Sequence, residues 1–272
     1  MAYHAGELAV QERHGVAELA DRLGGKMLRG ELPDAVRDFL ESQPLLFVSS
    51  VDGDDVWASV LHGMPGFIDT LGDRTVLARA HAPLVFPGPV GLLALEPATR
   101  RRARINGTGE LTDEGLRVTT EQVYGNCPKY ISRREIVGVE PARTRATEQA
   151  GLSRDDRAMI EAADTFIVAS YAEGGADASH RGGNPGFVTV ERDALRFPDY
   201  AGNNMFMTLG NLELNPRIGL LFADWETGDT LQLTGAAKLG DRVVDVQVER
   251  AVRTPGALPY RWALLERSRF NP

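Results

Sequence analysis

Apolar and polar positions alternate along the chain in short runs, and these runs predict a mainly β structure. Val, Ile, Leu, Phe and Thr gather in short stretches that Gly, Pro and Asp separate. Regularly spaced short strands of this kind favour barrels or sandwiches. The stretches expected as strands are Leu45–Val51, Val56–Leu61, Thr75–Ala78, Val90–Leu95, Arg101–Gly109, Gly115–Glu121, Thr165–Ser170, Ala176–Arg181, Gly186–Val190, Arg217–Ala223, Thr230–Leu239 and Arg242–Val248.

Apolar residues at helical spacing predict helices outside these strands. The expected ranges are Leu8–Leu23, Pro33–Ser42, Arg154–Ala163 and Met205–Asn215. For the last of them, Asn203 and Asn204 are the candidate N-cap, and Pro216 disfavours helix in the residue before it.

The second set of strands repeats the first. Leu46–Ser50 resembles Phe166–Ser170 at an offset of 120 residues, and Gly91–Ala94 resembles Gly219–Phe222 at an offset of 128. The offset grows by eight residues, so the second copy carries an insertion of that size, which we place around Asn203–Leu212. Two small β-barrels in tandem are therefore expected. The expected parts are an N-terminal helical segment (1–44), a first barrel (45–137), a connector with a helix (138–164), a second barrel (165–250) and a C-terminal tail (251–272).

Composition narrows the class of protein. Hydrophobic residues make up 43% and charged residues 25%, as in ordinary globular proteins. A formal charge of −8 argues against general nucleic-acid binding. The apolar runs are too short to cross a bilayer and the first residues do not resemble an export signal, so we expect no membrane association and a cytoplasmic location. The single cysteine, Cys127, cannot form an internal disulfide, and the histidines do not cluster as metal ligands, so no metal site is expected.

The two copies differ where a ligand site is expected. Ser179-His180-Arg181 in the second copy corresponds to Ser59-Val60-Leu61 in the first. The inserted segment leads a chain into a helix N-terminus, where free amides favour phosphate, and Arg181 would add a charge-assisted contact. Strand alternation places Ser179 and Arg181 on one face, with His180 pointing away unless the strand ends there. The alternative is a plain helix cap and a surface ion pair.

The sequence resembles the pyridoxamine 5′-phosphate oxidase-like family of FMN-binding split barrels, in a longer, tandem subgroup. The resemblance rests on the run from Asn203 through Asn215-Pro216-Arg217 to Phe222, on Asp229–Gly235, on Tyr124–Ile131 and on His180–Phe187. It implies an intrachain pseudo-dimer of split barrels with flanking helices, and FMN bound between the two barrels.

The resemblance also suggests which residues would hold the flavin. Its phosphate would contact Ser179, Arg181, Asn203 and Asn204, with His180 as a neighbour. From the first barrel, Tyr130 could stack on the ring and Lys129 could hold negative charge near N1.

Other side chains of the first barrel leave alternatives open. Arg102 and Arg104 share a strand face and could meet an anionic substrate, although a solvated strand face is the alternative. Cys127 has no histidine near it in the sequence and is expected to be an inert thiol. No residue stands out as a catalytic acid or base.

The expected function is an FMN-dependent oxidoreductase that transfers a hydride between flavin N5 and a small substrate or NAD(P)H, with oxygen or another molecule as the acceptor. A non-catalytic flavin- or haem-binding carrier or sensor is the alternative, as is a reductase that uses a deazaflavin. The asparagines at 203 and 204 replace the basic pair of the oxidase, so vitamin B6 oxidation does not follow from the sequence. Whether one or two flavins bind, and whether two tandem chains form a homodimer, stays open.

Overall fold

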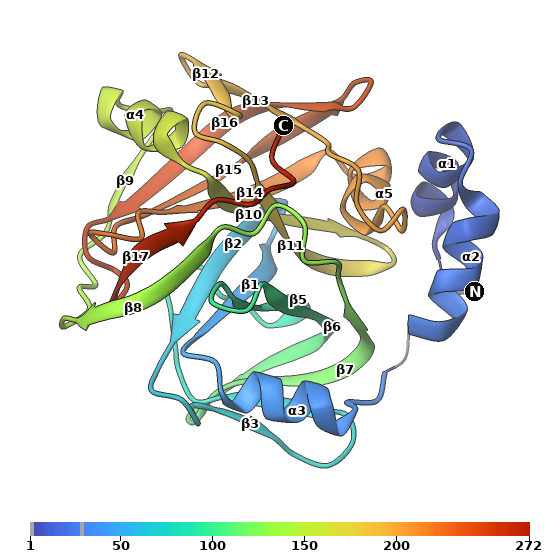
Figure 1. The fold of residues 1–272 in the computed structure, drawn as a ribbon, viewed down its shortest axis with the longest axis horizontal. Helices are drawn as coiled ribbons and strands as arrows, with labels where there is room; N and C mark the ends of the chain where they lie inside the picture. Colours follow the sequence, from blue (N-terminus) through green and yellow to red (C-terminus); the bar gives the residue numbers. More distant parts are fainter. Residues whose placement is uncertain (1–2, 28–29) are drawn as a thin grey trace.

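Two antiparallel sheets of the same design build most of the protein (Figure 1). The structure is a computed structural model that describes residues 3–27 and 30–272, so residues 1–2 and 28–29 of the expected N-terminal segment lie outside the described residues. The first sheet contains β1 (Leu45–Asp52), β2 (Asp55–His62), β3 (Ile68–Thr70), β4 (Thr75–Ala78), β5 (Gly88–Glu96), β6 (Arg101–Thr112) and β7 (Gly115–Gly125). The second contains β10 (Thr165–Ala172), β11 (Gly175–Gly182), β12 (Thr189–Glu191), β13 (Ala194–Pro198), β14 (Arg217–Ala223), β15 (Thr230–Leu239) and β16 (Val243–Thr254).

The strand order confirms the tandem repeat. The first sheet runs β2-β1-β5-β6-β7-β4-β3, and the second runs β11-β10-β14-β15-β16-β13-β12, which is the same order. The register agrees as well, since Val48 pairs with Ser59 in the first sheet and Val168 pairs with Ser179 in the second. The expected fold class, a mainly β pseudo-dimer of split barrels within one chain, is therefore confirmed.

The helices flank the two barrels. They are α1 (Ala5–Arg13), α2 (Ala17–Met27), α3 (Asp34–Glu41), α4 (Arg154–Ala162) and α5 (Met207–Leu214). The single helix expected over Leu8–Leu23 is wrong, because α1 ends at its C-cap His14 and Gly15 takes a left-handed φ of 66°. The eight extra residues of the second copy fall in the connection between β13 and β14, which contains α5. Among the described residues, no helix has the length and apolar character needed to cross a membrane.

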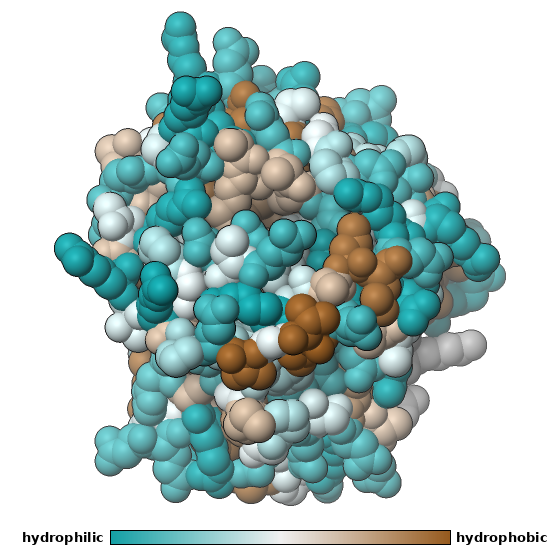
Figure 2. All heavy atoms as spheres, turned by 60° about the vertical axis from the view of Figure 1, so that its left-hand side comes forward, coloured by the Kyte–Doolittle hydropathy of each residue, from teal (hydrophilic) through white to brown (hydrophobic). Residues whose placement is uncertain are grey.

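Two segments outside the barrels pair with each other. β8 (Arg133–Val139) and β17 (Tyr260–Glu266) form a separate antiparallel ribbon, while β9 (Thr147–Gln149) joins the edge of β16. The stretch expected as a C-terminal tail thus contains a strand, and β16 runs four residues past the expected boundary at 250. Figure 2 views the molecule from the side on which the ribbon lies in Figure 1, and shows a mostly hydrophilic face with a small group of apolar side chains.

Each barrel has its own apolar core, and a third cluster lies between them. The third cluster draws on both repeats, with Phe47 and Leu93 from the first and Ile167 and Leu221 from the second. β5 and β6 of the first barrel pack on β11 of the second, and β14 and β15 of the second pack on β2 of the first. Burial of this cluster holds the two barrels together as one body.

Two glycines at equivalent positions let the barrel backbones approach each other. A Cβ on Gly91 would lie 2.6 Å from the Cα of Asp177, and a Cβ on Gly219 would lie 2.6 Å from the carbonyl oxygen of Val56. Gly91 lies in β5 of the first barrel and faces β11 of the second. Gly219 lies in β14 of the second barrel and faces β2 of the first. Only glycine therefore fits at either position without separating the barrels.

Helix α1 packs against α5, although the two are about 200 residues apart (Figure 1). A Cβ on Gly6 would lie 2.1 Å from the carbonyl oxygen of Gly210, so the helices touch through glycine. Glu7 is 2% exposed in this contact, and its Oε2 accepts a hydrogen bond of 2.9 Å from the backbone N–H of His4. Burial raises the pKa of Glu7 to about 8.

We expect Gly91→Ala and Gly219→Ala each to lower the free energy of unfolding by about 1–3 kcal/mol, because the new methyl group meets backbone that cannot move aside alone. Chemical denaturation measures the change. Gly138→Ala is the matched control, since its Cβ would have no neighbour closer than 3.7 Å. Equal stability of all three variants would contradict the proposed close contact.

Glu7→Gln should flatten the pH dependence of stability. The Glu7 carboxyl keeps its proton to about pH 8 in the folded state but only to about 4.5 in the unfolded chain. The folded state therefore binds more protons between these values, and its stability falls as the pH rises through this window. The slope that Glu7 contributes is at most about 1.4 kcal/mol per pH unit.

Denaturation at several pH values between 5 and 8 measures this slope in the wild type and in Glu7→Gln. The control is Glu12→Gln, on the exposed side of the same helix. An unchanged slope in Glu7→Gln would show that Glu7 is ionised in the folded protein.

Candidate functional site

A polar pocket lies where the two barrels meet, at the end of β11 and beside the start of α5. It brings together every residue that the sequence analysis proposed for the site except Lys129. From the first barrel and the segment after it, Arg102, Arg104, Asn126, Cys127 and Tyr130 line the pocket. From the second repeat, the lining includes Ser179, His180, Arg181, Gly182, Phe187, Asp199, Tyr200, Asn203, Asn204, Phe206 and Thr208.

The pocket reaches both faces of β11 because β11 is the edge strand of its sheet and ends at Gly182. Ser179 and Arg181 pair with residues of the second barrel's own core, whereas His180 pairs with Ile167, whose side chain belongs to the cluster between the barrels. His180 therefore points toward the first barrel. The strand alternation was predicted correctly, but it does not remove His180 from the site, because the pocket surrounds the strand end.

The equivalent place in the first barrel is filled by side chains. Gln232 donates to the carbonyl oxygen of Ala58 and to the hydroxyl of Ser59, both at 2.9 Å. The hydroxyl of Tyr260, at the start of β17, donates to the carbonyl oxygen of Gly63. Valine and leucine at 60 and 61 supply no charge there. The interface between the barrels thus has cationic side chains at the end near His180 and Arg181. At the other end, the equivalent positions 60 and 61 carry no charge.

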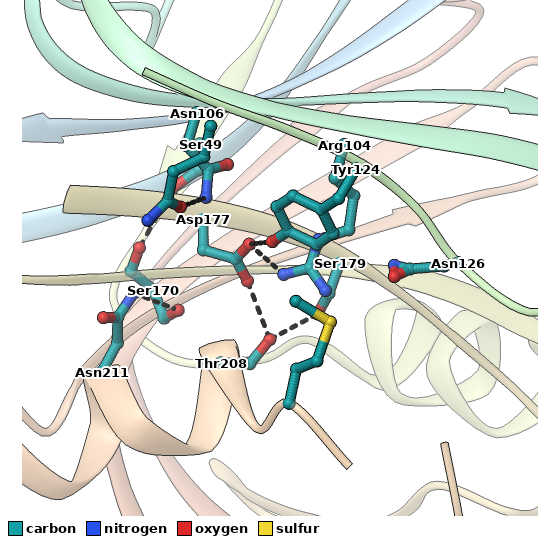
Figure 3. Close-up of polar contacts among 12 residues, drawn as sticks. Ser49, Arg104, Asn106, Tyr124, Asn126, Ser170, Asp177, Ser179, Thr208 and Asn211 are labelled. Carbon is teal, nitrogen blue, oxygen red and sulfur yellow. Dashed lines mark hydrogen bonds and ion pairs between the residues drawn. The ribbon is translucent and has the colours of Figure 1, made fainter. Parts of the chain in front are cut away.

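A buried carboxylate, Asp177, holds the floor of the site together (Figure 3). It forms an ion pair with Arg104 of the first barrel, and it accepts hydrogen bonds from Tyr124 at 3.0 Å and from Thr208 at 2.9 Å. The Thr208 hydroxyl also lies 2.9 Å from that of Ser179. The network joins both barrels to the first turn of α5, so it fixes the positions of the lining groups.

The sequence analysis assigned no role to Asp177 or Thr208, and Tyr124 entered it only within the segment Tyr124–Ile131. One signal in the sequence could have identified Asp177. At the offset of 120 residues Asp177 aligns with Trp57, so the second copy has a carboxylate where the first has a large apolar side chain. The network also changes the role of Arg104. Expected to meet an anionic substrate, Arg104 is buried and paired with Asp177 instead.

Arg102, a half-buried cation of the site, has no carboxylate partner among the described residues. Its guanidinium donates to the carbonyl oxygen of Cys127 at 2.7 Å and lies 3.0 Å from Nδ1 of His180. Burial lowers the pKa of Arg102 to about 10, so the group is still charged at neutral pH. Arg181, in contrast, is paired with Asp199 at 2.6 Å.

Several buried nitrogen atoms of the pocket have no hydrogen-bond partner within the described part of the chain: Nε of Arg102, Nε of Arg181 and Nε2 of His180. Burial, and then the positive charges of Arg102, Arg181 and Arg134, lower the pKa of His180 well below its usual range. All of these groups are donors or cations. The pocket is therefore suited to a group that is anionic and accepts hydrogen bonds.

The start of α5 adds free backbone donors. The expected cap at Asn203 and Asn204 is wrong, because the helix begins two residues later and its N-cap is Phe206, with a left-handed φ of 58° and no side-chain cap. Asn203 instead accepts a hydrogen bond of 3.1 Å from the N–H of Met205 and donates to Asn126 across the interface at 3.1 Å. The N–H groups of the first helical turn are thus not satisfied by a capping side chain.

The N-terminal helices support this turn from behind. The side chain of Gln11 donates to the carbonyl oxygen of Met205 at 2.9 Å, and the ring of His14 stacks on that of Phe206 with centroids 4.9 Å apart. Helix α1 and its C-cap, which precede the first barrel, therefore support the wall of the pocket that the second repeat contributes.

Aromatic side chains lie at the rim. The rings of Tyr130 and Tyr200 are 5.2 Å apart between centroids, and the hydroxyl of Tyr130 donates to the carbonyl oxygen of Ala201 at 3.1 Å. Lys129 is not among the residues that line the pocket. Its ammonium lies over the ring of Phe270 in the C-terminal segment, 5.9 Å from the ring centroid.

Within residues 3–27 and 30–272, no group of three or more His, Cys, Asp or Glu side chains is arranged to hold a metal ion.

Comparisons with solved structures find distant similarity. HupZ from Group A Streptococcus is 15% identical, with 40% of this chain and 98% of HupZ covered and a TM-score of 0.31. The FAD binding protein from Mycobacterium smegmatis is 14% identical, with 40% and 97% covered and a TM-score of 0.29. A putative pyridoxamine 5′-phosphate oxidase from Corynebacterium glutamicum is 11% identical, with 43% and 98% covered and a TM-score of 0.28.

No curated protein matches the chain. Residues 152–255 match the family model described as pyridoxamine 5′-phosphate oxidase. This match spans α4 and the strands of the second barrel, which hold Ser179, His180 and Arg181. The second barrel and the helix before it thus resemble the pyridoxamine 5′-phosphate oxidase family, over 104 of the chain's 272 residues.

Proposed function

We propose that the pocket between the barrels binds FMN through its phosphate and that the chain is an FMN-dependent oxidoreductase. When bound, the flavin would supply the redox chemistry, by exchanging a hydride at N5 with a small substrate or a nicotinamide. The observation that carries the proposal is Arg102, a half-buried guanidinium with a buried Nε and no carboxylate partner among the described residues, next to other unpartnered donors. Because a charge that is largely shielded from water is costly when unpaired, a phosphate would stabilise this arrangement.

The donor set fits a phosphate. Arg102 and Arg181 would neutralise its charge, the His180 Nε2–H would donate to one of its oxygens, Ser179 lines the same pocket, and the first turn of α5 offers free amides. The Asp177 network beneath these groups keeps Thr208 and Ser179 in place and prevents Arg104 from competing for the ligand. These are binding and positioning roles for residues of this chain.

The rim suits a planar ring. Tyr130 and Tyr200 come from different barrels and present aromatic surface beside the polar pocket, where they would exclude water from one part of a bound ring system. The match of residues 152–255 to the pyridoxamine 5′-phosphate oxidase family model supports the proposal of an oxidoreductase.

The first experiment is a visible absorption spectrum of the purified protein after FMN is added and the excess removed. We expect flavin bands at one FMN per chain, because the equivalent place in the first barrel is filled. Two flavins per chain would contradict a single site. A Soret band with added haem and no retained flavin would favour the haem-binding alternative.

Arg102→Ala and Arg181→Ala should each raise the Kd for FMN by about 10- to 100-fold, since a hydrogen bond to a charged group contributes roughly 1.5–3 kcal/mol. A fluorescence titration measures the Kd. Arg196→Ala is the matched control, because Arg196 pairs with Asp245 on an exposed surface. Wild-type affinity in both folded pocket variants would overturn the site assignment.

Turnover separates an enzyme from a carrier. Reduction of the bound flavin by NADH or NADPH, followed by reoxidation with oxygen, would support the oxidoreductase. Tight binding of FMN without reduction by either nicotinamide would favour a carrier or sensor.

A further inference from the structure

His180 is held by a contact that determines which of its nitrogens carries a proton. Its Nδ1 lies 3.0 Å from Nη1 of Arg102, which belongs to the other barrel. A guanidinium donates hydrogen bonds and accepts none, so Nδ1 must be the acceptor and carries no proton. The proton of the neutral ring is then on Nε2.

The other end of the ring is a donor without a partner. His180 is 7% exposed, and its Nε2 makes no hydrogen bond to any residue that the structure describes. His180 lines the pocket together with Arg102 and Arg181. A buried N–H group is almost always paired, so its partner is to be found in what the pocket binds.

The charges around His180 keep the ring neutral. The groups that act on it are Arg102 from β6, Arg181 from β11 and Arg134 from β8, all of them cationic. The nearby carboxylates are engaged elsewhere, since Asp177 pairs with Arg104 and Asp199 with Arg181. A proton on Nδ1 would add another positive charge and would remove the acceptor that Arg102 uses.

We infer that Arg102 fixes His180 as the Nε2–H tautomer, and that this N–H is a specificity-determining donor that selects ligands with an anionic oxygen. Arg102 is in this respect a positioning residue, which acts on the ligand through His180. The selection of an anionic oxygen rests on the proposed binding of a phosphate in this pocket. The fixed tautomer does not, because it follows from the contact between the two side chains alone.

Two consequences separate this arrangement from an ordinary histidine. A histidine that binds anions as a cation loses this contact as the pH rises through its pKa, whereas a fixed N–H donor does not change between pH 5 and 8. A protonated Nε2 also cannot bind iron, because an imidazole binds metals through a nitrogen that carries no proton. The arrangement thus disfavours His180 as a haem ligand.

The test is nitrogen-15 NMR of the histidine rings in the full chain without ligand, with the His180 signals assigned by their loss in His180→Gln. We expect a protonated Nε2 and an unprotonated Nδ1 at every pH from 5 to 8. Arg102→Lys, which can still donate to Nδ1, should preserve this state. Arg102→Met, which cannot donate, should yield a mixture of tautomers. A protonated Nδ1, or titration of the wild-type ring in this range, would overturn the inference.

The ligand side is tested by titration with FMN. His180→Phe should raise the Kd at least about tenfold, because it removes the donor, whereas His180→Gln keeps an N–H group and should stay within a few-fold of wild type. His81→Phe is the control, since His81 is exposed and lines no part of the pocket.

If the wild type does not bind FMN, the proposed function fails, and the same titrations are made with sulfate as the probe. If His180→Phe and the wild type bind the probe with equal affinity, the His180 Nε2–H does not select the ligand. If the wild type binds neither FMN nor sulfate, the proposed role of this N–H is also wrong. The NMR result decides the tautomer in every case.

Discussion

The close approach of the two barrel backbones is the constraint on which the rest of the structure depends. Gly91 and Gly219 bring each barrel within contact distance of the second strand of the other. Because the strands meet so closely, Arg104 of one barrel can pair with Asp177 of the other, and Arg102 can reach His180. A wider interface would leave the same side chains too far apart to form one pocket.

The tandem arrangement explains why the two ends of this interface differ. In a dimer of identical chains every substitution appears twice, so a site can be neither lost nor gained at one end alone. Here the two halves are separate stretches of one chain. The first is apolar at Val60 and Leu61, whereas the second carries charge at the equivalent positions and has a longer connection that contains α5. The second half is also the part that matches the family model.

The sequence alone predicted the tandem barrels well, because a repeat offset carries over directly to strand order and register. Of the nine residues that it proposed for the site, eight line the pocket, since the difference between the copies at 179–181 marks the end of an edge strand. It did not predict that β17 pairs with β8 or that Asp177 organises the floor. Both depend on contacts between distant segments, which leave no local pattern. The start of α5 was misplaced because Phe206 adopts a left-handed conformation that is uncommon outside glycine.

The packing of α1 on α5 has a consequence for how the chain acquires its structure during synthesis. Gln11 and His14 are synthesised about 190 residues before their partners Met205 and Phe206. The first barrel has its own core and can form while the N-terminal helices still lack their docking surface. Their docking is a long-range contact, and such contacts form late because a long loop must close first. The turn that borders the pocket is therefore completed only when both halves of the chain are folded.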